Sequence, residues 1–348
     1  MNNSVKILCF LCSFAFMFSA KAQYRIEVLD SNTFQLGEGV ILSKTSFRGL
    51  SVVDDQTIWV SGSRGTMARS VDGGKTFIYT QLKGYEKSDF RDVEAFDAKR
   101  AIIMSSGTPA YILKTTDGGQ TWKEVYKNTD TAYFLDGMDF WDDKRGMLVG
   151  DPVNGHFLLM QTKDGGKTWK ELDSTQTPEA MEGEAVFAAS GTSIRCWGKN
   201  DVGIVSGGML SRLFVKNMKS KGWLSQFNVL PSEKQSSGCF SIVYHYGHIV
   251  GIGGDYLKEK NTSANYFILN LKDPKILTRT TEFYFSCIES LDVDKFIFCG
   301  TSACTIDDIG LKETIHISLE PFHVVRKAKN GKAVFLAGPK GKIGKLVW

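Results

Sequence analysis

The stretch TTDGGQTW at residues 115–122 has two near copies, SVDGGKTF at 70–77 and TKDGGKTW at 162–169. Counted between their aspartates, the copies lie 45 and 47 residues apart. Self-similarity at a period of this size is typical of propellers and solenoids. The three copies therefore predict a repeat architecture. They also raise the question of whether the repeated element serves the fold or a reaction.

Each copy contains the parts of a tight turn. An aspartate accepts hydrogen bonds from the turn backbone and from a following threonine, and a glycine pair supplies positive φ angles. The closing aromatic ring can pack between repeats. Every part has a local structural purpose, and a catalytic site is not normally present three times. We therefore interpret the aspartates of these boxes as structural: Asp72, Asp117 and Asp164.

A second marker extends the period over the whole chain. A short apolar segment ending in a glycine turn occurs seven times, near residues 60, 105, 149, 205, 251, 298 and 336. A strand-like segment precedes each one, near residues 47, 90, 134, 183, 238, 285 and 322. Alternating apolar residues without a helical period indicate four strands per unit, joined by a turn, a glycine loop and a box turn. The sequence thus predicts an all-β, seven-bladed propeller of four-stranded antiparallel blades.

The two ends of the chain complete the predicted ring. The last unit ends at residues 342–348 with a third strand and no fourth, while residues 24–29 form a lone strand before the first unit. Pairing these strands would complete the seventh blade and remove two exposed sheet edges. We expect one propeller domain over residues 23–348, closed by the N-terminal strand.

Residues 1–22 have the features of a signal peptide. Lys6 provides a short basic region, and residues 7–18 form an apolar stretch too short to cross a bilayer comfortably. Residues 20–22, Ala-Lys-Ala, form a cleavage site. We expect a chain that begins at Gln23, is periplasmic or secreted, and has no membrane span.

Composition narrows the class of protein. Apolar residues make up 42% of the chain and charged residues 23%, as in soluble globular proteins. Without Lys6 and Lys21, 40 basic side chains face 38 acidic ones, a balance that argues against a nucleic-acid-binding protein. Among the five cysteines beyond the signal peptide, Cys299 and Cys304 flank one tight loop and could pair in an oxidising compartment. Alternatively, most of the cysteines are buried small hydrophobes.

The repeated element resembles the Asp-box, or BNR repeat, of sialidases and other propeller proteins. Besides the three boxes, the chain beyond residue 22 contains FRGL at 47–50, FRDV at 90–93, GDP at 150–152 and GPKG at 338–341. In this arrangement it is similar to a narrower family, the exported bacterial relatives of the photosystem II stability and assembly factor. This resemblance implies a non-catalytic scaffold that helps a partner assemble.

Charged residues gather on one predicted face. In a four-stranded blade, the glycine loops and the blade-to-blade connections share one face, here named the Gly-loop face, and the box turns share the other, the box face. Loops on a rigid scaffold are the usual place for binding. We expect a protein partner or an acidic ligand to dock on the Gly-loop face of a monomer. The alternative is that these residues only line a hydrated polar opening of the central channel. The candidate binding residues are Arg48, Arg64, Arg91, Asp92, Asp151, Arg212, Asp255, His323 and Lys340.

A glycoside hydrolase is the alternative function. Such an enzyme needs two carboxylates about 5–10 Å apart across the sugar. The candidates are Asp136 or Asp139 together with Glu184, from neighbouring blades. The same carboxylates could instead pair with arginines as structural ions. No tyrosine stands at the start of an inner strand, where a sialidase would need one.

No cofactor or metal is expected from the sequence. A dinucleotide fingerprint between a strand and a helix is missing, as is a Cys-x-x-Cys pair. His245 and His248 have no third ligand nearby in the sequence, and a catalytic metal usually needs three.

Overall fold

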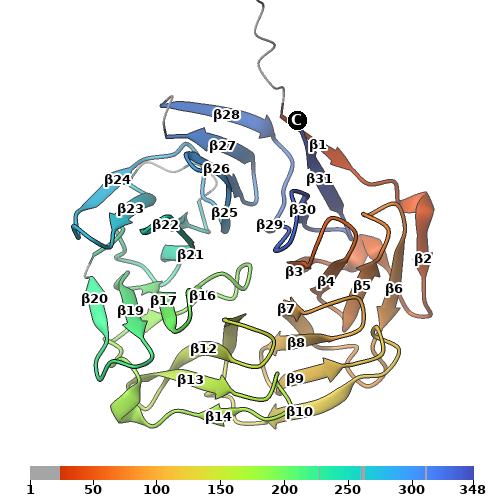
Figure 1. Cartoon of the computed structure of the whole chain (residues 1–348), viewed down its shortest axis with the longest axis horizontal. Coiled ribbons are helices and arrows are strands. Elements are labelled where there is room, and N and C mark those ends of the chain that lie inside the picture. Colours follow the sequence, from red (N-terminus) through yellow and green to blue (C-terminus); the bar gives the residue numbers. More distant parts are fainter. Residues whose placement is uncertain (1–23, 227, 259, 261–262, 310–311) are drawn as a thin grey trace, which may run out of the picture.

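Seven β-sheets surround a central channel in the structure of this protein, a computed structural model (Figure 1). It describes residues 24–348 except 227, 259, 261–262 and 310–311. The predicted all-β, seven-bladed propeller is confirmed. The predicted signal peptide lies outside the described residues. Within the described ranges, no helix is long and apolar enough to cross a membrane.

In the first three blades, strands that are consecutive in sequence run from the channel outward. Blade 1 consists of β3 (Phe47–Val52), β4 (Ile58–Gly62), β5 (Thr66–Ser70) and β6 (Phe77–Gln81), with β2 (Phe34–Leu36) added in parallel to β6. Blade 2 consists of β7 (Asp89–Ala95), β8 (Ala101–Ser106), β9 (Ala110–Thr115) and β10 (Lys123–Asn128). Blade 3 consists of β11 (Leu135–Phe140), β12 (Gly146–Val153), β13 (His156–Thr162) and β14 (Lys170–Glu171).

The next three blades follow the same plan. Blade 4 consists of β16 (Ile194–Trp197), β17 (Asp201–Val205), β19 (Leu213–Asn217) and β20 (Leu224–Gln226). Blade 5 consists of β21 (Ser237–His245), β22 (His248–Asp255), β23 (Tyr266–Asn270) and β24 (Ile276–Arg279). Blade 6 consists of β25 (Cys287–Asp292), β26 (Lys295–Cys299), β27 (Cys304–Asp308) and β28 (Glu313–Ser318). Short 3-10 turns lie in the connections at Ser31–Thr33, Leu42–Lys44 and Ser174–Gln176.

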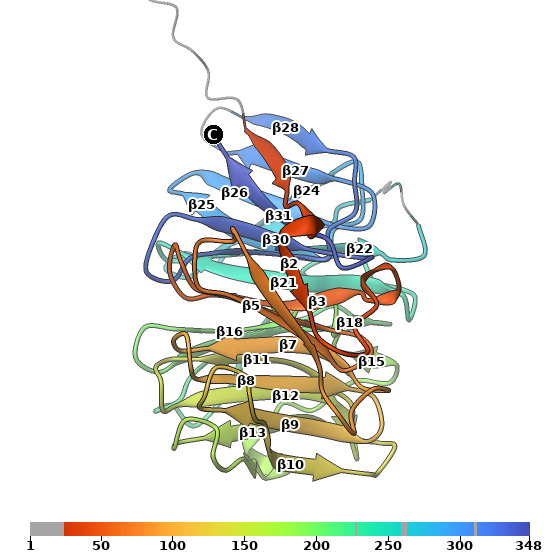
Figure 2. The same cartoon turned by 90° about the vertical axis from the view of Figure 1, so that its right-hand side faces the viewer.

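Both ends of the chain build blade 7, as predicted. Its inner strands are β29 (Val324–Lys327), β30 (Val334–Ala337) and β31 (Ile343–Val347), and β1 (Arg25–Val28) is its outermost strand. The ladder pairs Arg25 with Val347 and Val28 with Gly344. Figure 2 shows β1 lying beside β31 when the disc is seen from its side. This pairing closes the ring and covers the edge of β31.

The Asp boxes form the turns between the third and fourth strands of blades 1, 2 and 3. In the third box, Asp164 Oδ1 accepts a hydrogen bond from the Thr168 amide (3.0 Å), and Asp164 Oδ2 accepts one from the Thr168 hydroxyl (2.6 Å). Gly166 has a φ of 74°, and a Cβ there would lie 2.2 Å from Ile102 of blade 2. The box ring Trp169 packs edge-on against Phe140. The box therefore fixes a turn and also fits it against neighbouring strands.

The fourth blade departs from the sequence-based prediction. Residues 183–189 are expected to form its inner strand, but that strand is β16, and within the predicted range only β15 (Glu184–Ala185) is a strand. It pairs with β18 (Gly207–Gly208) at the inner side of blade 5. Residues 186–193, here named the plug segment, run into the middle of the ring before β16 begins (Figure 1). The run AASGTS at 188–193 fits there because its side chains are small.

Cys299 and Cys304 occupy directly paired positions on β26 and β27. The structure has both as free thiols, together with Cys196, Cys239 and Cys287. All except Cys196 are buried in strands.

Candidate functional site

The plug segment is bonded to inner strands on several sides of the channel. A guanidinium nitrogen of Arg326 on β29 donates to the Ser190 carbonyl (2.7 Å). The Thr192 hydroxyl lies 2.6 Å from the Ser241 hydroxyl on β21. Because these contacts cross the middle of the ring, the plug segment stands between one cavity at the Gly-loop face and another at the box face.

Gly191 allows the plug segment to pass close to blade 2. Its φ is 72°, a conformation that favours glycine. A Cβ at this position would lie 2.3 Å from the Asp92 carboxyl group. Asp92 itself is buried and accepts hydrogen bonds from the amides of Val93 and Met138, both at 2.8 Å.

Four side chains enter the Gly-loop cavity from equivalent positions of their inner strands. In β3, β7, β11 and β21 the ladder skips one residue near the start of the strand, which is a β-bulge. Bulges re-aim a side chain and are common beside functional sites. The skipped residues all line one cavity of about 550 Å³: Arg48, Arg91, Asp136 and Phe240. The same strand position therefore contributes a basic side chain in two blades, an acidic one in a third and an aromatic one in a fourth.

The basic side of the cavity comes from blades 1 and 2. Arg48 donates a hydrogen bond to the Ala189 carbonyl (3.1 Å) and Arg91 donates one to the Ala188 carbonyl (3.4 Å) of the plug segment. Arg91 Nε also donates to Asp89 (2.8 Å). Burial, followed by the charge of Arg91, lowers the pKa of Arg48. The plug carbonyls thus hold two like charges side by side at the mouth of the cavity.

His323 lies on the same side, directly before β29. It is buried, and burial together with the charges of Arg48, Arg91 and Lys342 lowers its pKa to about 3. The imidazole is therefore neutral at physiological pH. Among the described residues, His323 Nδ1 has no hydrogen-bond partner.

The acidic side of the cavity comes from blade 3. Asp136 is completely buried and forms no ion pair within the described part of the chain; the backbone amides of Ala188 and Asp151 are the donors nearest its carboxyl oxygens, although neither makes a well-formed hydrogen bond. Burial and the nearby Asp151 raise the pKa of Asp136 well above its ordinary value, and Arg91 acts less strongly in the opposite direction. Asp151 accepts a hydrogen bond from the Val186 amide (3.0 Å), and burial raises its pKa to about 6.

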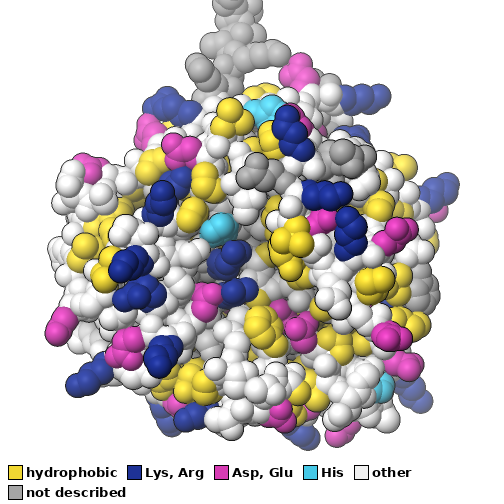
Figure 3. Space-filling view, turned by 180° about the vertical axis from the view of Figure 1, so that it is seen from behind, with side chains coloured by type: hydrophobic (Ala, Val, Ile, Leu, Met, Phe, Trp, Pro, Cys, Tyr) yellow, Lys and Arg dark blue, Asp and Glu magenta, His cyan; other side chains and the backbone are white. Residues whose placement is uncertain are grey.

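An aromatic cluster forms a third wall. Phe187 of the plug segment stacks on Phe240, with ring centroids 4.0 Å apart and an interplanar angle of 5°. Tyr284 packs edge-on against Phe240 at 5.0 Å, and Tyr256 lies edge-on to both phenylalanines. Figure 3 shows this face with a hollow near its middle, Lys, Arg and His side chains on one side of it and hydrophobic ones across from them.

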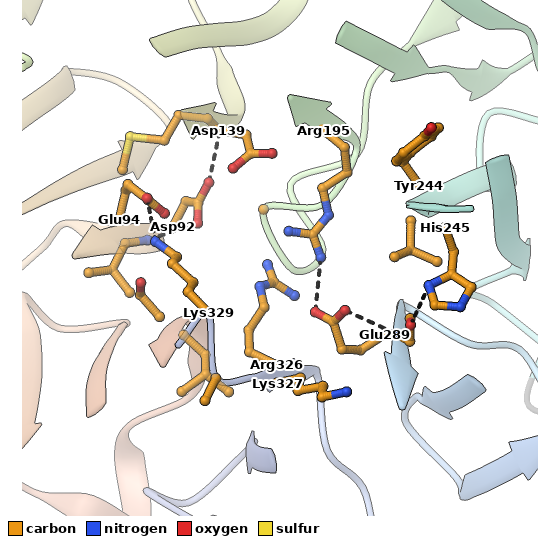
Figure 4. A pocket seen from close by; sticks show the side chains of 18 of the residues that line it. Asp92, Glu94, Asp139, Arg195, Tyr244, His245, Glu289, Arg326, Lys327 and Lys329 are labelled. Carbon is orange, nitrogen blue, oxygen red and sulfur yellow. Dashed lines mark hydrogen bonds and ion pairs between the residues drawn. The ribbon is translucent and has the colours of Figure 1, made fainter. Parts of the chain in front are cut away.

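The opposite end of the channel is a more highly charged cavity of about 600 Å³. Asp92, Glu94 and Asp139 lie on one side of it, and Arg195 and Arg326 reach toward its middle (Figure 4). Arg195 pairs with Glu289 (3.2 Å), and Lys329 pairs with Glu94. Burial raises the pKa of Asp92 to about 7, opposed by Arg326. These ions largely satisfy one another, so the box-face cavity is a structured ionic network.

The structure brings together five of the predicted site residues and separates the others. Arg48, Arg91, Asp136, Asp151 and His323 line the Gly-loop cavity. The prediction is wrong in placing Asp92 and Asp139 on that face, because both point into the box-face cavity. Inner strands run along the channel, so residues three apart on β11 reach opposite ends of it.

The remaining candidates lie outside the Gly-loop cavity. Glu184 and Arg212 form a buried ion pair with each other, in which Arg212 Nε donates to Glu184 Oε1 at 2.8 Å. Asp255 lies 3.6 Å from the Lys234 ammonium. Arg64 and Lys340 lie in tight turns with φ of 62° and 59°. The Glu184 carboxylate is thus paired with Arg212, and it lines neither the Gly-loop cavity nor the box-face cavity.

The sequence analysis missed the aromatic wall and the plug segment. Phe240 could have been found, because it occupies the position in GCFSI at 238–242 that Arg48 occupies in FRGL at 47–50. Phe187 could not, since nothing local shows that residues 186–193 cross the channel. Within the described ranges, no group of three His, Cys, Asp or Glu side chains could hold a metal ion.

Comparisons with known proteins agree with this architecture. A family model described as photosynthesis system II assembly factor YCF48 matches residues 87–183, which span blades 2 and 3. A solved structure of YCF48 bound to D1 peptide has a TM-score of 0.64 at 14% identity, covering 94% of this chain and 98% of that chain. YCF48 from Cyanidioschyzon merolae has a TM-score of 0.60 at 13% identity, covering 92% and 98%. The predicted resemblance to this assembly-factor family is confirmed.

The fold is also shared more widely. The Pan2 WD40 domain of Neurospora crassa has a TM-score of 0.59 at 10% identity, covering 86% of this chain and 88% of that chain. No curated protein matches the sequence.

Proposed function

We propose that this protein is an exported, non-catalytic propeller that binds a protein partner at its Gly-loop face. The observation that carries this proposal is the set of four β-bulges that turn Arg48, Arg91, Asp136 and Phe240 into one cavity. Two arginines held by plug carbonyls suit an acidic group on the partner. A YCF48 propeller bound to D1 peptide supports a peptide-binding role for a propeller of this kind.

Apolar side chains beside the cavity support a protein partner. Met181, Met209, Tyr256 and Leu257 are 49%, 48%, 49% and 75% exposed, although each is a large hydrophobic residue. All four lie in connections on the Gly-loop face, next to β15, β18 and β22. Interfaces typically combine such apolar and aromatic contacts with arginine. The partner segment that fits is therefore acidic where it meets the arginines and apolar beside them.

The three carboxylates predicted for a hydrolase do not share one cavity. Asp136 lines the Gly-loop cavity, Asp139 lines the box-face cavity, and Glu184 is bonded to Arg212. An acid and a base on opposite sides of one sugar would have to share a cavity.

The test is recovery of partners from envelope extract by the wild type and by an Arg48→Ala/Arg91→Ala variant. The matched control is Arg100→Ala/Arg145→Ala, which removes two arginines from turns on the box face. We expect the control to retain a partner that the first variant loses, and that partner to bind more weakly at higher salt. Equal recovery of every partner by both variants would contradict the proposed site.

A further inference from the structure

Basic and acidic side chains face each other across the Gly-loop cavity without meeting in an ion pair. Arg48 and Arg91 lie on one side, and Asp136 and Asp151 lie on the other. Among the described residues, Asp136 has no ion-pair partner and no well-formed hydrogen bond, although the side chain is completely buried; only the backbone amides of Ala188 and Asp151 lie near its oxygens. A buried polar group without a partner is costly and rare in native proteins. The acidic side of the cavity therefore presents a carboxyl group that a positively charged hydrogen-bond donor could pair with.

We propose that the Gly-loop cavity binds a zwitterionic group, with its carboxylate between Arg48 and Arg91, its ammonium against Asp136 and Asp151, and an apolar side chain against Phe187. The zwitterionic group is the part of the partner that would enter the centre of the Gly-loop face. The inference rests on the proposed function only because both place binding on that face. The group can come from a free amino acid or from a short peptide.

Both halves of the cavity are needed for this assignment. A simple anion would satisfy the arginines and leave the buried Asp136 carboxyl unpaired. A simple cation would satisfy the carboxylates and lie in the field of two arginines. The aromatic wall adds a favourable surface for the ammonium, since a cation is attracted to an aromatic face, and for an apolar side chain. A cavity of about 550 Å³ has room for an amino acid or a dipeptide.

Binding should release a proton. The charged groups that face Asp136 are Asp151 on β12 and Arg91 on β7, with Arg48 on β3 across the cavity and the neutral His323 before β29. Because burial and Asp151 raise the pKa of Asp136 and so favour its protonated form, an arriving ammonium favours release of that proton when it pairs with the carboxylate. The affinity should therefore rise with pH over the range in which Asp136 titrates.

The first experiment is titration calorimetry of the whole protein with phenylalanine and two analogues that each lack one charge, hydrocinnamate and phenethylamine. We expect phenylalanine to bind about tenfold or more tightly than either analogue, which corresponds to the loss of one charge-assisted contact. The dipeptide Gly-Phe distinguishes the sources, because its charges are farther apart. Tighter binding of phenylalanine indicates a free amino acid, and tighter binding of Gly-Phe indicates a peptide.

The second experiment uses Asp136→Asn, with Asp173→Asn as the matched control because Asp173 is exposed and makes no side-chain cap bond. We expect Asp136→Asn to lose most of the preference for the zwitterion and the proton release, measured in buffers of different ionisation enthalpy. Asp173→Asn should behave as the wild type. The analogue series on the wild type keeps the inference testable if Asp136→Asn does not fold.

The inference is overturned if neither phenylalanine nor Gly-Phe binds the wild type better than the analogues with one charge. It is also overturned if a well-folded Asp136→Asn variant binds them unchanged. Failure of the proposed function would look different. In that case partner recovery would not depend on Arg48 and Arg91, whatever the small ligands do.

Discussion

Removal of β1 should open the propeller ring, and the structure sets the size of the effect. In a chain that begins at Ser31, β31 loses a four-residue ladder, from Arg25–Val347 to Val28–Gly344. It also loses apolar side chains that pack against the core between blades 1, 6 and 7, among them the aliphatic Ile26 and Leu29. With about 1 kcal/mol for each of three or four ladder hydrogen bonds and about 1 kcal/mol for each half-buried side chain, the unfolding free energy should fall by about 5 kcal/mol. That is a large share of the typical 5–15 kcal/mol.

The measurement is urea unfolding followed by circular dichroism, with a chain that begins at Tyr24 as the reference. A synthetic peptide of residues 24–30 should raise the midpoint of the shortened chain by adding back the missing strand, and a scrambled peptide should not. A loss smaller than about 1 kcal/mol, or equal effects of the two peptides, would refute the argument that this pairing closes and stabilises the ring.

Three further changes test the boxes, the buried acid and the plug segment. Asp164→Ala should lower the unfolding free energy by about 1–2 kcal/mol and leave ligand binding unchanged, because the turn loses its hydrogen-bond acceptor. Hydrogen bonds outweigh the effect of burial and hold the pKa of Asp164 at about 2, so its contribution is complete above pH 4 and is lost as the pH falls toward 2. Asp136→Asn should be more stable than the wild type at pH 8 but not at pH 4, since the raised pKa makes ionisation of the folded wild type costly. Gly191→Ala should cost about 2–4 kcal/mol, because its φ is 72° and its Cβ would meet Asp92.

Each of these three predictions has an outcome that would contradict it. A normally stable Asp164→Ala variant that no longer binds a partner would show that the boxes serve binding. A melting temperature of Asp136→Asn that follows the wild type at every pH would show that Asp136 is not held protonated. Unchanged stability of Gly191→Ala would mean that the plug segment does not lie against blade 2.

Much of the fold could be predicted because its signals are local. The strands of a blade follow one another in the chain, so a turn such as the box at 162–169 fixes a pairing between neighbours in sequence. Closure by residues 24–29 followed from the unmatched third strand of the last unit. The prediction failed at residues 183–189, where a long connection replaces a strand. The run AASGTS at 188–193 has no period that would distinguish a surface loop from one inside the ring.

The sequence by itself determined the architecture, because the strands and turns of each blade depend on short-range pattern. Only the tertiary structure decided which side chains meet. Asp136 and Asp139 are three residues apart on β11 but serve different ends of the channel, since the strand runs along its axis and the plug segment divides it. Glu184 pairs with Arg212, and Phe187 stacks on Phe240, although the residues of each pair are far apart in sequence. Such contacts depend on how the seven blades and the plug segment pack around one channel, and no local spacing in the sequence encodes that packing.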